Sequence, residues 1–187
     1  MAVLAFLVGM IALATGPGFT YLFVYGEGLP GAAPLEVATL VLATGPLGLA
    51  GILLGRWGAD RLGRRITGAV ALSGTGLAVA LAYSGSFGSL AVGYLATVPL
   101  GGAFAPAQGA LGSELVPTAI RATVAGWATV TGVIGLAVFG VVADATGGVA
   151  AAAWSLGGLV AASALVFRAL PETRDVELED LEGGTVG

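Results

Sequence analysis

The sequence predicts an all-α membrane protein with six transmembrane helices arranged as two inverted three-helix repeats. Three observations lead to this prediction. The 187 residues are 57% hydrophobic and only 10% charged, whereas soluble domains are about 25% charged. The apolar runs are long enough to cross a bilayer, which takes about 20 helical residues. The basic residues fall in alternate connections between these runs.

Composition also excludes several classes of protein. The chain has no cysteine, so disulfides and thiolate metal sites are absent, and no histidine, which disfavours a transition-metal site. The acidic residues are concentrated in connections and in the C-terminal tail, and no catalytic constellation is present. We therefore expect no enzyme, no cofactor, no bound metal and no nucleic-acid partner.

The first apolar run continues to Tyr25 and has no basic residues before it, so it is too long for a signal peptide and is predicted to span the membrane. Alternating transmembrane strands do not fit such continuous apolar runs. The predicted spans cover approximately residues 2–25, 35–55, 67–84, 88–112, 123–145 and 148–169.

Five connections and an acidic tail separate and follow these spans. The connections are expected at 26–34, 56–66, 85–87, 113–122 and 146–148. Residues 170–187 contain six acids and one arginine and are predicted to be a cytoplasmic tail, which is expected to be disordered from Asp175 to Gly187.

All seven basic residues are arginines, and with six spans they fall on one side of the membrane. The positive-inside rule makes that side cytoplasmic, with both termini inside, in the cytoplasmic membrane. Five or seven spans would scatter the same residues over both sides. The arginines are at positions 56, 61, 64, 65, 121, 168 and 174.

Glycine and proline interrupt two spans near their middle. Proline removes an intrahelical hydrogen bond and glycine tolerates the bend, and transporters place such broken helices at the substrate site. The alternative is an ordinary kinked packing helix. The expected hinge residues are Gly16, Pro17 and Gly18 in the first span, and Pro99 and Gly101 in the fourth.

A short internal echo supports the inverted repeat. The pattern Ala-Asp-x-x-Gly follows the second span at 59–63 and ends the fifth span at 143–147. These are equivalent places in two triplets, on opposite faces of the membrane.

Three stretches resemble loop motifs of the major facilitator superfamily. Asp60, Arg61, Gly63, Arg64 and Arg65 match the motif G-x-L-a-D-R-x-G-R-R, although Gly58 stands at its leucine. Residues 114–121 with a glycine at 126 resemble E-l-x-P-T-x-x-R-x-t-x-x-G, and 171–179 resemble the tail P-E-T-[KR]-g…L-E. The resemblance implies a secondary transporter, with this chain equivalent to helices seven to twelve of a twelve-helix fold.

The resemblance leaves the solute open. The first span lacks the glutamine and asparagine that sugar porters carry there, whereas Gln108 is similar to the metabolite–proton symporter pattern. A sugar, an organic acid, another small metabolite and a drug-like solute remain alternatives. Proton coupling also stays open, because no ionisable residue lies at mid-span.

The resemblance implies that the first and fourth spans line the substrate path, which the fifth can join. For each aromatic residue the alternative is packing against lipid or a neighbouring helix. The candidates on these spans are Thr15, Phe19, Tyr21, Phe104, Gln108, Trp127 and Thr131.

Acids and arginines of the cytoplasmic connections are predicted to form a latch that breaks when the cytoplasmic side opens. The alternative is that the arginines only fix topology. The predicted members are Asp60, Arg61, Arg64, Arg65, Glu114, Arg121, Glu172 and Arg174.

One bundle has no opposing wall, so alternating access needs a second one. Because Met1 leads directly into an apolar run, we expect either a missing or separately encoded N-terminal half, or pairing of two copies. The alternative function is a non-transporting membrane fragment or assembly subunit that retains the fold.

Overall fold

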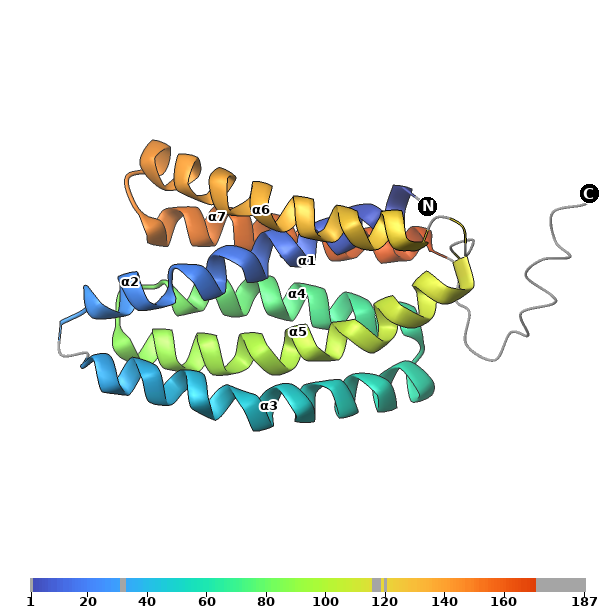
Figure 1. The fold of residues 1–187 in the computed structure, drawn as a ribbon, viewed down its shortest axis with the longest axis horizontal. Coiled ribbons are helices and arrows are strands. Elements are labelled where there is room, and N and C mark those ends of the chain that lie inside the picture. The colour runs from blue at the N-terminus through green and yellow to red at the C-terminus, as the bar shows by residue number, and fades with distance from the viewer. Residues whose placement is uncertain (1, 31–32, 116–118, 120, 171–187) are drawn as a thin grey trace, which may run out of the picture.

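The chain forms a bundle of helices that lie side by side in a computed structural model (Figure 1). The structure describes residues 2–30, 33–115, 119 and 121–170. Within these residues there is no strand, so the predicted all-α class is confirmed. The elements are α1 (Ala2–Thr20), α2 (Leu22–Glu27), α3 (Pro34–Arg61), α4 (Arg64–Ala82), α5 (Phe87–Leu115), α6 (Arg121–Thr146), α7 (Val149–Ser163) and the 3-10 helix η2 (Ala164–Ala169).

Several of these helices are those of a membrane protein. Among the described residues, four are long and apolar enough to cross a bilayer: Pro34–Arg61, Arg64–Ala82, Phe87–Leu111 and Val149–Ala169. α1 and α6 contribute shorter apolar stretches, Ala5–Thr20 and Val133–Thr146, so the count of six spans stays a prediction. The outer surface is apolar, with Leu42 78% and Val141 69% exposed, which suits lipid better than water.

The helices form two layers of three (Figure 1). α3 packs on α5 and α5 on α4 in one layer, while α1 packs on α6 and α6 on α7 in the other. Contacts of α4 with α7 and with α1 join the layers. The largest fully buried side chains lie in this core, and they include Tyr83, Phe104, Phe139, Leu72 and Leu90.

Small residues allow the helices to approach closely, as is usual for helices in lipid. A Cβ atom at Gly51 would lie 2.5 Å from the Cα of Pro99, and one at Gly55 would lie 2.5 Å from the Cα of Ala103. These contacts hold α3 against α5. Gly76 of α4 meets Gly157 of α7 in the same way.

The arginine-rich stretch 56–66, predicted as a connection between spans, is mostly helical. α3 continues to Arg61 and α4 begins at Arg64. No proline interrupts the stretch, and arginine and alanine favour helix. Arg61 lies one turn after Trp57, with its guanidinium carbon 5.9 Å from the indole centroid. The turn is confined to Leu62 and Gly63.

The predicted first span is divided at Tyr21, between α1 and α2. The break lies four residues after Pro17, whose carbonyl still accepts a hydrogen bond of 3.1 Å from the Tyr21 amide. The helix thus continues past Pro17, and the break at Tyr21 lies beyond the preceding turn that a proline strains. The chain reaches its first connection in two helical segments.

The arginines gather at one end of the bundle, which we call the arginine end: Arg56, Arg61, Arg64, Arg65, Arg121 and Arg168. Figure 1 shows the α3–α4 turn, the start of α6 and the end of η2 together there, with the N-terminus nearby. Arg174 lies outside the described residues. This placement is the one that the positive-inside argument requires.

Candidate functional site

Gly63 makes the sharp turn between α3 and α4 at the arginine end. Its φ of 99° is a left-handed conformation that suits glycine and strains other residues. The turn places the last residues of α3 beside the first residues of α4, so that Asp60 and Arg61 are exposed next to half-buried Arg64 and Arg65. Sequence neighbours thus become a compact charged cluster.

Arg65 links the start of α4 to the end of η2. Its Nε donates to the Phe167 carbonyl at 3.1 Å and its Nη2 donates to the Arg168 carbonyl at 2.9 Å. The Phe167 carbonyl also accepts a hydrogen bond of 3.1 Å from the Leu170 amide. The guanidinium therefore adds a second donor at Phe167 and provides a donor to the Arg168 carbonyl at the helix end, where intrahelical donors run out. Gly68 leaves room for the Phe167 ring, since a Cβ there would lie 2.5 Å from Cε1.

The other predicted latch residues are placed less completely. Glu114 lies in the last turn of α5 and Arg121 begins α6, so both belong to the arginine end, but their side chains are outside the described part. Glu172 and Arg174 lie outside the described residues altogether. The contacts described for Arg65 join it to carbonyl oxygens, and the wider latch stays a prediction.

The path candidates of the first predicted span have neighbours on α5 and α6. Thr15 is half-buried and its hydroxyl donates to the Ile11 carbonyl at 2.9 Å. Phe19 is 40% exposed and meets the ring of Tyr94 on α5 edge-on, with centroids 5.6 Å apart. Tyr21 stacks on Phe139 of α6 at 5.3 Å. An exposed ring and a hydroxyl therefore lie one turn apart on α1.

The remaining candidates divide between core and surface. Phe104 is 2% exposed and meets Phe167 edge-on at 6.2 Å, so in this conformation it packs in the core. Gln108 and Thr131 are half-buried, and the Thr131 hydroxyl donates to the Trp127 carbonyl. Trp127 is 57% exposed on α6. Phe19 and Trp127 are thus the two candidates with open aromatic surface.

The expected hinge segments of α1 and α5 lie against each other. A Cβ placed on Gly101 would lie 3.8 Å from the Thr15 methyl group, an ordinary van der Waals contact. Pro17 and Pro99 lie within one turn of these two residues along their helices. The two helices with interrupted hydrogen-bond ladders therefore share a contact at the points where each is weakened.

Tyr83 is a functional candidate that the sequence reasoning missed. It is fully buried after α4, and its hydroxyl donates to the Gly18 carbonyl at 3.0 Å, with the Pro17 carbonyl at 3.3 Å. Tyr25 donates in turn to the Tyr83 carbonyl at 3.0 Å. The available signal was a tyrosine at the end of an apolar run, whose hydroxyl must find a partner when it is buried.

Three hollows on the surface of the described residues bear on the predicted sites. One, of about 530 Å³, lies between α4 and the α7–η2 segment. A second, of about 390 Å³, lies between α3, α4 and α5 and has an almost entirely apolar lining. A third, of about 210 Å³, is the one of the three that includes a predicted path residue, Tyr21.

The described part offers side chains that can bind a solute. No group of three or more His, Cys, Asp or Glu side chains there could hold a metal ion. The aromatic rings and hydroxyls around α1 and α5 can stack on a solute or exchange hydrogen bonds with it. The arginine end supplies charge-assisted contacts.

Compared with known protein families, the chain matches none, and no curated protein matches it in sequence. The resemblance to the major facilitator superfamily therefore rests on the short motifs at 60–65, 114–126 and 171–179.

Proposed function

We propose that this chain is one six-helix half of a secondary transporter similar to the major facilitator superfamily. It moves a small organic solute across the cytoplasmic membrane by alternating access. The observation that carries this proposal is the contact between the weakened segments of α1 and α5 at Thr15 and Gly101. Helices broken at membrane depth and facing each other are the usual site of solute binding and rocking.

The order of helix packing supports the proposed inverted repeat. Such a repeat pairs α1 with α5, α3 with α6, and α4 with α7. Several contacts have a counterpart, although the α1–α4 contact has none of comparable size between α5 and α7. The packing of α1 on α6 corresponds to that of α3 on α5. The α3–α4 contact likewise corresponds to the α6–α7 contact, and α4 packs on its own counterpart α7.

The proposed solute site uses the exposed aromatic residues of this half. Phe19 and Trp127 offer ring surface, and Thr15 and Gln108 offer polar groups from α1 and α5. A second six-helix bundle supplies the opposite wall, either as a second copy or as an N-terminal half. The side chains of both bundles together determine which solute binds and whether its transport is coupled to protons.

The arginine end is the proposed cytoplasmic gate, with both termini on that side. Arg65 already links α4 to η2, which are the third helix of each proposed triplet. Asp60 and its neighbours extend this link to the second bundle when the cytoplasmic side is closed. A partly buried network can bias a two-state equilibrium by a few kcal/mol, about the amount that separates the two states.

Two-sided accessibility tests this function without knowledge of the solute. The chain has no cysteine, so a Thr15→Cys variant in liposomes carries one thiol. Alternating access predicts that an impermeant methanethiosulfonate reagent labels it from either side. The matched control is Leu159→Cys on α7, whose side chain is 52% exposed and is expected to face lipid. This variant should stay unlabelled. Labelling of Thr15→Cys from one side only, or from neither, would instead favour the non-transporting alternative.

A further inference from the structure

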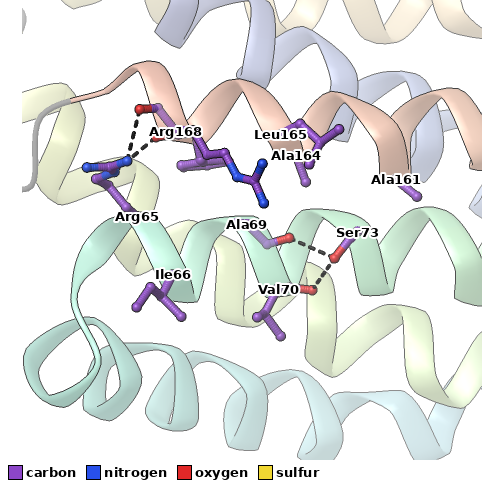
Figure 2. Close-up of a pocket in the computed structure, with 10 residues that line it drawn as sticks. Arg65, Ile66, Ala69, Val70, Ser73, Ala161, Ala164, Leu165 and Arg168 are labelled. Atoms are coloured by element: carbon purple, nitrogen blue, oxygen red, sulfur yellow. Dashed lines mark hydrogen bonds between the residues drawn. The ribbon is translucent and has the colours of Figure 1, made fainter.

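The groove between α4 and the α7–η2 segment has a charged end and an apolar body (Figure 2). Arg65 and Arg168 lie at one end, and alanine, valine, isoleucine, leucine and phenylalanine line the rest apart from Ser73. The Ser73 hydroxyl donates to the carbonyls of Ala69 and Val70 at 2.8 and 3.2 Å. The Ser73 hydroxyl therefore has its hydrogen-bond partners within α4. The apolar body of the groove is suited to a hydrocarbon chain.

The rims of the groove indicate where its occupant comes from. Ile66 and Val70 of α4 are 55% and 60% exposed, and Leu165 of η2 is 60% exposed. Rims of this kind face lipid in a helix bundle that spans a bilayer. The molecules that reach the groove are therefore those of the surrounding membrane.

The length of the groove fits one half of a bilayer. Its lining on α4 runs from Arg65 to Ser73, eight helical steps at about 1.5 Å each, or about 12 Å. The hydrocarbon core is about 30 Å thick, so one leaflet is about 15 Å deep. An acyl chain that enters beside the arginines therefore follows the groove through most of its leaflet.

The charged end of the groove is complementary to a phosphate. Arg168 is exposed, and among the residues described its guanidinium has no hydrogen-bond or ion-pair partner. Figure 2 shows this guanidinium turned back over the groove, while that of Arg65 reaches the backbone of η2. A planar guanidinium binds phosphate oxygens in a bidentate manner, and basic pockets between membrane helices suit anionic head groups.

We propose that this groove binds one anionic phospholipid. The phosphate lies on Arg168, within the field of Arg65, and one acyl chain lies along Ile66, Val70 and Leu165. The proposal requires the arginine end to lie at the membrane surface. It does not require transport, so its failure and that of the proposed function can be told apart.

Selectivity in this site comes from the head group. Lipid tails are as apolar as the groove, so a chain gains little by moving from bilayer to protein. One arginine near the membrane surface should favour an anionic over a zwitterionic lipid about fivefold. Removing that charge should abolish the preference.

Native mass spectrometry of the full chain in non-ionic detergent tests the proposal. Dioleoyl phosphatidylglycerol and dioleoyl phosphatidylcholine are titrated separately, and the bound lipid is counted. We expect one phosphatidylglycerol bound about fivefold more tightly than phosphatidylcholine. Arg168→Gln should remove this difference. Arg56→Gln, which removes an exposed arginine at the same end but outside the groove, should keep it.

A second pair of variants tests the body of the groove without changing charge. Ala161→Leu fills the groove and should weaken binding of both lipids. Ala162 is exposed and lies outside the groove, so Ala162→Leu should leave binding unchanged. Circular dichroism checks that all variants keep their helices.

Several results would overturn the proposal. Equal affinity for the two lipids would do so, as would an Arg56→Gln effect as large as that of Arg168→Gln. Displacement of phosphatidylglycerol by equimolar inorganic phosphate would reveal a simple anion site. Loss of dimers rather than of bound lipid in Ala161→Leu would make the groove an interface between copies.

Discussion

The hydroxyl of Tyr83 donates a hydrogen bond of 3.0 Å to the carbonyl oxygen of Gly18. This bond joins the end of α4 to the last turn of α1, next to Pro17. The ring of Tyr83 also lies 4.8 Å from that of Tyr25 and 6.0 Å from that of Phe139. The buried Tyr83 side chain therefore holds the C-terminal end of α1 in place between the two layers of the bundle.

Tyr83→Phe should lower stability by about 0.5–1.5 kcal/mol, because the substitution removes the buried hydrogen bond from the Tyr83 hydroxyl to the Gly18 carbonyl. For a chain of this size that corresponds to a loss of about 2–4 °C in the melting temperature per kcal/mol. Thermal unfolding in detergent measures the change. Tyr21→Phe is the matched control, since no hydrogen bond of its hydroxyl is found within the described part. Equal shifts for the two variants would contradict this role of Tyr83.

Arg65→Gln should loosen η2 and leave the rest of α7 in place. The substitution removes the two charge-assisted bonds to the carbonyls of Phe167 and Arg168, at a cost of about 1 kcal/mol because the site is partly exposed. Hydrogen–deuterium exchange of residues 164–170 should rise about fivefold. Arg56→Gln serves as the control, and unchanged exchange in Arg65→Gln would show that η2 does not depend on this arginine.

Gly51→Ala should destabilise the α3–α5 contact by about 2 kcal/mol or more. The new methyl group would overlap the backbone at Pro99, and overpacked cores typically cost about 1–3 kcal/mol. Gly45→Ala is the control on the same helix, because nothing lies within 4 Å of its new methyl group. The control should be neutral or slightly stabilising. Thermal unfolding of both variants in detergent provides the measurement, and a neutral Gly51→Ala would refute the tight approach.

Asp60→Asn tests the predicted latch. If Asp60 holds the cytoplasmic side closed, its neutralisation should favour the open state by about 1 kcal/mol, or about fivefold in population. The readout is the initial rate at which a reagent added from the arginine end labels a Thr15→Cys background. The rate should rise at equal membrane level. An unchanged rate would leave the arginines as topology anchors only.

The main helices followed from the sequence because apolar runs and their glycine turns are local signals. Gly85 and Gly147 adopt φ of 98° and 81° in the predicted tight turns 85–87 and 146–148. The helical conformation of the stretch from Arg56 to Arg61 was not predicted, because its charge suggested a connection outside the spans. A charged segment at the membrane surface continues a helix without cost, since its side chains reach water.

The sites were harder to predict because they depend on which distant segments pack together. Arg65 and Arg168 are separated by 103 residues, and nothing in either segment indicates that they share a groove. Phe104 looked like a path residue by its span, yet it packs on Phe167. The Thr15–Gly101 contact between the two predicted hinges was foreseeable only through the proposed repeat.

The central claim of this account is a six-span bundle whose arginine end is cytoplasmic. The most direct measurement labels single-cysteine variants in intact cells with an impermeant maleimide. Ser86→Cys, in the α4–α5 turn at the opposite end, should react from outside, whereas Arg64→Cys should react only after the cells are permeabilised. Labelling of Arg64→Cys in intact cells, or protection of Ser86→Cys, would contradict the topology and the gate and lipid site that depend on it.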